Sequence, residues 1–98
     1  MRYEFHQEAL EEYGEATRWY AERDLKLAFR FIDAVEETVA RVVEKPLRWR
    51  VFEEDVRRCL TRVFPYAVLY SVETEYVLTI AVMHSHREPG YWRKRIAP

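Results

Sequence analysis

The chain has 98 residues, of which 49% are hydrophobic and 34% charged, with a formal net charge of −1. This composition excludes a disordered chain, and the length predicts one domain over residues 1–98 with a single modest core. The only cysteine, Cys59, excludes an internal disulfide and a cysteine-rich zinc site. The longest apolar run, residues 76–83, is far shorter than the ~20 residues that span a membrane. The N-terminus is acidic and lacks the apolar stretch of a secretory signal, so we expect a cytoplasmic protein.

The small net charge conceals an asymmetry between the two halves. Residues 1–47 carry 7 Lys and Arg against 11 Asp and Glu, a balance of −4. Residues 48–98 carry 9 against 6, a balance of +3. A basic half in a nearly neutral chain can bind a polyanion locally or an acidic protein partner, although many such charges are simply solvated.

The first half predicts a strand followed by two helices. Residues 2–5 alternate and indicate a short strand. Apolar residues then recur with helical spacing in residues 7–44, and Asp24 between the two periodic stretches is a plausible N-cap. Pro46 ends the second stretch near Glu44. We therefore expect an antiparallel helical hairpin with one apolar seam.

The second half changes to a period of two. After a polar connection over residues 47–55, an alternating segment around Cys59 is followed by residues 66–72 and 76–83, both rich in β-branched and aromatic residues. Pro89 and Gly90 end the last strand, and residues 91–96 fit a short helical turn. The predicted fold class is α+β: an N-terminal strand, the helical hairpin and a three-stranded antiparallel meander, four strands in all, with the helices on one face.

Polar and aromatic residues of the basic half are the candidates for function. His84 and His86 would share a face of a strand, which suggests a metal, yet no third ligand has suitable spacing, so a hydrogen-bonded histidine is the simpler interpretation. Arg58 and Arg62 would lie on one side of a strand, either as a solvated strip or as a clamp for an acidic partner. Trp92 either packs back on the sheet or anchors a partner.

The order of these motifs resembles the RelE/ParE superfamily, the toxins of type II toxin–antitoxin operons, and in particular its ParE-like, plasmid stabilisation type. The resemblance extends over nearly the whole chain, and its most specific parts are the F-P-Y segment and the H-x-x-R-x-P-x-x-W segment. The matching positions are Glu11, Glu12, Tyr13, Ala16, Trp19, Tyr20, Leu27, Ala28, Phe31, Val35, Pro46, Arg57, Arg58, Phe64, Pro65, Tyr66, Tyr70, Ala81, Val82, His84, Arg87, Pro89 and Trp92.

Two branches of this superfamily imply different activities. RelE-like members cleave mRNA on the ribosome, whereas ParE-like members poison DNA gyrase without known nuclease chemistry. A ribonuclease needs a base, an acid and cations for the pentacovalent phosphate. By resemblance, Arg87 and Tyr91 match the late arginine and aromatic positions of the nuclease branch, and His84 or His86 can carry a proton near neutral pH. However, Ala67 stands where such nucleases carry an arginine, and only Arg48 and Arg50 replace their lysine pair.

The preferred interpretation is therefore a ParE-like toxin that binds DNA gyrase and is neutralised by a cognate antitoxin, with no cofactor, small molecule, metal or membrane involved. The alternative is a metal-independent mRNA endoribonuclease that uses Arg87 with His84, His86 or Tyr91. A second alternative is a non-toxic adaptor whose basic half binds an acidic partner. The residues expected to bind the antitoxin or the target are Arg58, Arg62, Arg87, Trp92, Arg93 and Arg95.

Overall fold

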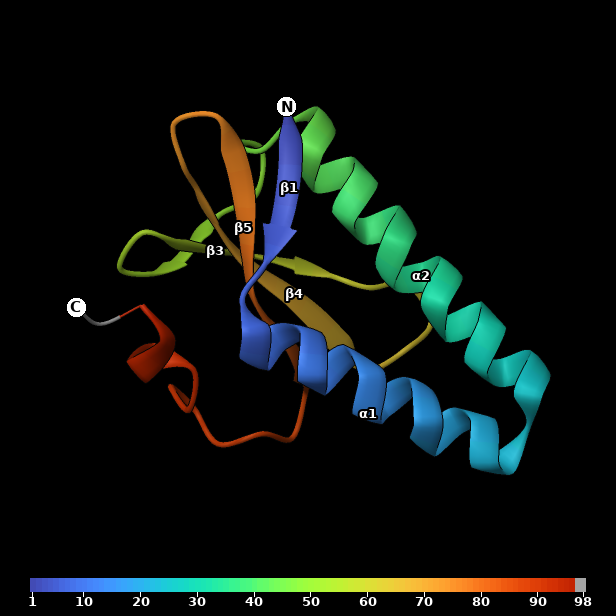
Figure 1. Cartoon of the computed structure of the whole chain (residues 1–98). Coiled ribbons are helices and arrows are strands. Elements are labelled where there is room, and N and C mark those ends of the chain that lie inside the picture. The colour runs from blue at the N-terminus through green and yellow to red at the C-terminus, as the bar shows by residue number, and fades with distance from the viewer. Residues whose placement is uncertain (97–98) are drawn as a thin grey trace.

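The computed structural model describes residues 1–96 and has an α+β architecture. Two helices lie along one side of a twisted sheet, and the C-terminal segment lies on the other side (Figure 1). The elements in chain order are β1 (Arg2–Phe5), α1 (Gln7–Arg23), α2 (Leu25–Glu44), β2 (Val51–Glu53), β3 (Val56–Leu60), β4 (Tyr66–Val72), β5 (Tyr76–His84) and the 3-10 turn Arg93–Arg95. Among the described residues, no helix is long and apolar enough to cross a membrane.

The predicted helical hairpin is confirmed, and Asp24 serves both of its helices. The Asp24 backbone N–H donates to the carbonyl of Tyr20 at 2.8 Å and so ends α1. Its carboxylate accepts a hydrogen bond from the backbone N–H of Lys26 at 2.9 Å and so caps the start of α2. The chain therefore reverses its direction between the two helices at one extended residue. The backbone and the side chain of this residue bond to unpaired backbone groups at both helix ends.

The expectation of a four-stranded sheet is wrong, because the sheet has five strands in the order β1-β5-β4-β3-β2. The additional strand, β2, has only three residues inside the predicted polar connection, and its register with β3 is irregular. A strand this short shows no recognisable alternation. In addition, β1 pairs with β5 in parallel, so the sheet is mixed. The meander of β3, β4 and β5 is antiparallel as predicted.

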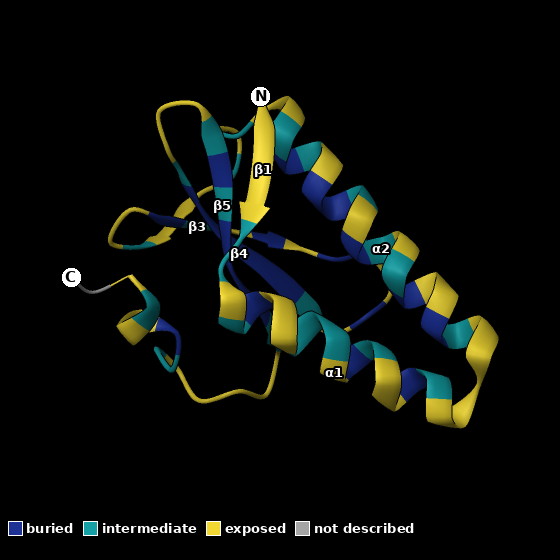
Figure 2. Cartoon of the chain, viewed as in Figure 1, coloured by how far each residue is buried: buried dark blue, intermediate teal, exposed yellow. Residues whose placement is uncertain are grey.

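Alternation along the strands divides the apolar side chains between the two faces of the sheet. Val68 and Val82 face the helices and pack with Phe31 and its neighbours, whereas Leu69 faces away and packs with Trp92. Figure 2 shows the resulting pattern, with buried residues along the sheet and on the inner sides of both helices. The central strands are therefore buried on both faces, which accounts for their nearly continuous apolar sequences.

Two strands end before the candidate residues that were expected to lie on them. β3 ends at Leu60, so Arg62 lies in the connection to β4 and does not share a strand face with Arg58. β5 ends at His84, so His86 lies in the following turn. The expected arrangement of these pairs on one side of a strand is therefore wrong. At both places the strand ends and irregular chain follows, and alternation with a period of two does not indicate where a strand ends.

Candidate functional site

The outer edge of β5 is only partly covered by a neighbouring strand. β1 pairs with residues 76–79, and in the described chain no strand continues beside the rest of β5. There the backbone N–H of Val82 donates to the Glu12 carboxylate at 3.1 Å, and the carbonyl of Ile80 accepts from Arg95 at 3.0 Å. Side chains therefore satisfy backbone groups that would otherwise lie on an open sheet edge.

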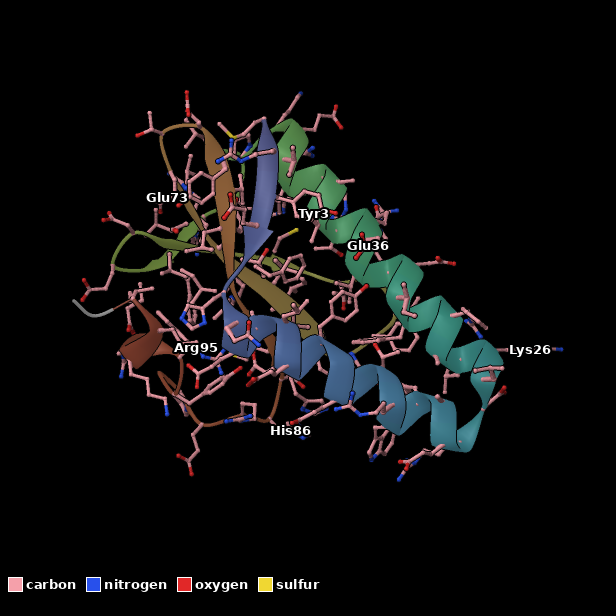
Figure 3. All side chains as sticks on the ribbon, in the orientation of Figure 1. Tyr3, Lys26, Glu36, Glu73, His86 and Arg95 are labelled. Carbon is pink, nitrogen blue, oxygen red and sulfur yellow. The ribbon has the colours of Figure 1, made fainter. Side chains whose placement is uncertain are left out.

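Glu12 of α1 is the centre of a polar network that holds the C-terminal segment. Its carboxylate accepts two hydrogen bonds from Arg95, at 2.7 and 3.1 Å, and one from the hydroxyl of Tyr91. The Arg95 side chain is only 6% exposed, and Glu8 lies 3.4 Å from it as a second carboxylate. Figure 3 shows Arg95 beside the N-terminal part of α1. Because a guanidinium this buried needs charged partners, the network ties residues 91–95 to α1.

The Tyr91 hydroxyl acts as a hydrogen-bond donor to Glu12 in this network. Burial raises the pKa of Tyr91 above its usual value of 10.0, and the hydrogen bond to Glu12 raises it further. The neutral phenol is thereby favoured over the phenolate. Tyr91 therefore keeps its proton near neutral pH and acts as a hydrogen-bond donor within this network.

Arg87 lies at the mouth of a cavity of about 440 Å³ between α1 and the end of β5. Its guanidinium lies 3.9 Å from the centroid of the Tyr91 ring and 3.9 Å from the Glu12 carboxylate, and half of its side chain is exposed. These contacts orient Arg87 without neutralising it fully, because a 3.9 Å approach is longer than a hydrogen bond. The cavity is lined by Glu12, Glu15, Ala16, Trp19, Tyr20, Tyr66, Val82, His84 and Arg87.

The two histidines contact each other, but they do not build a metal site. The Nδ1 atom of His84 accepts a hydrogen bond from the backbone N–H of His86 at 3.0 Å. The His84 ring also lies edge-on to Tyr66, with 5.0 Å between the centroids. Within residues 1–96, no three histidine, cysteine, aspartate or glutamate side chains gather as a metal site. His84 is thus held at the cavity wall, whereas His86 is exposed on the turn below α1 (Figure 3).

Ala67 is buried on the face of the sheet that carries Trp92. It is 3% exposed and packs with Leu69, Ile80 and Ala81. The methyl group therefore packs in the core, and it also lines a cavity of about 320 Å³ together with Arg58 and Met83. A cation at this position would need a charged partner, since burial of an unpaired charge is strongly unfavourable.

The C-terminal candidates are engaged within the chain. Trp92 is fully buried, so it packs back on the sheet, which was one of its two predicted roles. Arg93 forms a two-pronged ion pair with Glu53 at the end of β2, and this pair lowers the pKa of the Glu53 carboxyl. Together with Arg95, these residues fasten the C-terminal segment to both edges of the sheet.

Arg58 and Arg62 lie near the other edge of the sheet, away from the cavity of Arg87. Arg58 is exposed on β3, with its guanidinium 4.6 Å from the centroid of the Phe52 ring. Arg62 lies 3.6 Å from the Glu37 carboxylate of α2 and is 71% exposed. The structure therefore separates the candidate residues into a group around Arg87 and a group around Arg58.

The sequence interpretation missed the central role of Glu12. The sequence places Glu12 among the positions that match the family pattern, with no role of its own. The closest sequence signal is the spacing of Glu8 and Glu12, four residues apart on a helix that begins directly after the strand. That spacing places two carboxylates on one helix face. It does not reveal that Arg95 will meet them.

Comparison with known proteins agrees with this fold. The family described as "ParE toxin of type II toxin-antitoxin system, parDE" matches residues 3–89. Curated protein sequences gave no significant match. The solved structure titled "Chromosomal ParDE TA system from P. aeruginosa" contains a similar chain, with a TM-score of 0.74 and 15% identity over 86% of this chain and 95% of that one. With most of its length matched by the family, the chain belongs to the ParE toxins of type II toxin–antitoxin systems.

Proposed function

We propose that this toxin acts by binding and poisoning a macromolecular target in the cytoplasm, with DNA gyrase as the expected target, and that a cognate antitoxin neutralises it. The observation that carries the proposal is the Glu12 network, which engages Tyr91, one of the four residues expected to serve a nuclease. The Tyr91 hydroxyl donates a hydrogen bond to Glu12, and Arg95 donates two to the same carboxylate. The surface that remains is better suited to recognition than to proton transfer.

A missing cation supports the same conclusion. Phosphodiester cleavage requires positive groups around the pentacovalent phosphate. Arg87 is the candidate at the cavity mouth, but Ala67 is buried where the nuclease branch carries a second arginine. The remaining guanidinium near the cavity, Arg95, is 6% exposed and cannot reach a bound phosphate.

The nuclease alternative retains one specific observation in its favour. His84 and Arg87 line the same cavity, and Arg87 is half exposed. An imidazole and a guanidinium near one another are a minimal pair for phosphoryl chemistry. A variant of Arg87 therefore tests this alternative.

Neutralisation by the antitoxin would use arginines that are still exposed. Arg58, Arg62 and Arg87 meet this requirement, whereas Trp92 is buried and Arg93 is paired within the chain. Exposed guanidinium groups bind carboxylates with directed hydrogen bonds. We therefore assign these three arginines as the proposed contacts of the antitoxin or target, and reversing the charge of Arg58 and Arg62 together should weaken the toxin–antitoxin complex.

The test begins with inducible expression of the toxin alone and together with the protein encoded by its neighbouring reading frame. We expect growth arrest alone and rescue by the partner. Purified toxin should then inhibit supercoiling by gyrase, and primer extension on cellular mRNA should show no specific breaks. Normal growth on expression would contradict the toxin proposal.

The Arg87→Ala variant separates the two mechanisms, with Arg30→Ala as a control at an exposed arginine of α2 outside the cavity. Specific mRNA breaks that disappear in Arg87→Ala but persist in Arg30→Ala would establish the nuclease alternative. Gyrase inhibition that is weakened in Arg87→Ala alone would assign Arg87 to target binding.

A further inference from the structure

A second cavity, of about 400 Å³, lies at the sheet edge formed by β3 and β2, on the opposite edge from the Glu12 network. Three arginines from different parts of the chain meet there, and two aromatic rings lie among them. The cavity is lined by Arg41, Trp49, Arg50, Phe52, Arg58 and Leu60. Together with Arg48, whose guanidinium lies 5.4 Å from the Trp49 ring centroid, these residues form what we call the arginine–aromatic patch.

The arginine–aromatic patch carries an uncompensated positive charge. No carboxylate lines the cavity, and within residues 1–96 no ion pair engages Arg48, Arg50 or Arg58. Glu37 lies 2.8 Å from Arg41 and pairs with it. Three of the nine basic residues in the second half of the sequence, Arg48, Arg50 and Arg58, therefore gather at one place. Such a surface attracts polyanions over a distance set by the ionic strength.

The aromatic rings hold the guanidinium groups in position. Arg58 lies 4.6 Å from the centroid of Phe52, and Arg41 lies 5.9 Å from that of Trp49. A guanidinium against a ring face keeps its N–H donors at the rim of the ring. The side-chain donors of Arg58 take part in no hydrogen bond within residues 1–96, whereas Arg41 donates to Thr38 and to the Leu60 carbonyl and pairs with Glu37. Because these contacts already order the arginine side chains, binding an anion costs less conformational entropy than it would cost for mobile arginines.

We propose that the arginine–aromatic patch binds the phosphate backbone of a nucleic acid. Phosphate oxygens match the fork of donors that arginine presents, and successive phosphates along a strand match Arg48 and Arg50 of the loop before β2 together with Arg58 of β3. This inference goes beyond the proposed function, since binding to a nucleic acid requires neither gyrase nor an antitoxin.

An acidic peptide is the competing ligand, and the geometry favours it less. An amphipathic peptide anchors itself through apolar side chains in a hydrophobic groove. In the arginine–aromatic patch the ring of Phe52 is already approached by a guanidinium, and Leu60 is the only aliphatic side chain of the cavity wall. The cavity thus offers charge and hydrogen-bond donors rather than an apolar floor.

The test measures binding of the purified full-length toxin to a short fluorescent DNA by anisotropy, with both the duplex and its single strand as probes. If about three phosphates are contacted, the logarithm of the binding constant should fall with the logarithm of salt concentration with a slope of roughly −3. The Arg50→Ala/Arg58→Ala double variant should reduce this slope by about 2 and weaken binding at least tenfold at low salt. Both side chains are exposed, so thermal unfolding should be unchanged.

The matched control is Arg18→Ala/Arg30→Ala, which removes the same charge from exposed helix positions outside the patch. DNA binding that survives in the control and is lost in the patch variant supports the proposal. Absence of binding, equal losses in both double variants, or binding of a polyglutamate probe without binding of DNA would each overturn it. Toxicity and gyrase inhibition are measured separately, so failure here would leave the proposed function standing.

Discussion

The Glu12 network provides the sharpest prediction about stability. Glu12→Ala removes a carboxylate that is 14% exposed and accepts four hydrogen bonds, from the Val82 N–H, the Tyr91 hydroxyl and two nitrogens of Arg95. Breaking a buried ion pair by removing one partner costs about 3–5 kcal/mol. Arg95 keeps the Ile80 carbonyl and lies 3.4 Å from Glu8, so we expect the lower end of that range.

We therefore expect Glu12→Ala to lower the free energy of unfolding by about 3 kcal/mol, measured by urea denaturation. A loss of this size lowers the Tm of a domain of this length by roughly 12–24 °C. Glu12→Gln should lose less, about 1–2 kcal/mol, because the amide retains one accepting oxygen and the shape of the side chain.

Glu15→Ala is the matched control on the same helix. Glu15 is exposed, and no hydrogen bond or ion pair engages it within residues 1–96. Its replacement should change stability by no more than about 0.5 kcal/mol. If Glu12→Ala proves as mild as Glu15→Ala, the network does not fasten the C-terminal segment and does not withdraw Tyr91 from catalysis.

Three further predictions concern packing, backbone and pH. Trp92→Ala should cost about 3–5 kcal/mol in urea denaturation, because the indole is fully buried against the sheet; a loss below about 1 kcal/mol would contradict its packing role. Gly90→Ala should cost about 1 kcal/mol or more, since Gly90 has φ +74° and a Cβ there would meet the Arg93 side chain; an unchanged Tm would count against this geometry. Burial raises the pKa of Tyr70 from 10.0 to about 12. The stability that the buried neutral phenol contributes is therefore complete below pH 10 and is lost as the pH rises through about 12. Stability should therefore fall over that window, less steeply in Tyr70→Phe, and an equal slope in both proteins would exclude Tyr70 as a cause.

Much of the fold could be read from local patterns, and the failures have local causes as well. Apolar spacing located both helices, and Asp24 marked their boundary as predicted. β2 was missed because three residues are too few to show alternation. The ends of β3 and β5 were misplaced because turns, rather than a change of composition, stop these strands.

The candidate site was predictable only in part. Arg87 and His84 were expected as candidates, and they do line one cavity. The convergence of Arg41, Trp49 and Phe52 on Arg58 was not foreseen, because these residues come from a helix, a loop and a strand that are distant in sequence. Sequence reasoning identifies residue types with suitable chemistry, whereas the companions of each residue depend on the packing of whole elements.

The sequence by itself determined the helical hairpin, the antiparallel meander and the resemblance to a toxin family, because these depend on periodicity and on short motifs. The tertiary structure alone decided what the charged residues do. Glu12 and Arg95 are 83 residues apart, and only the approach of α1 to the open edge of β5 brings them together. Their burial turns two charges that look solvated in the sequence into the contact that holds the C-terminal segment in place.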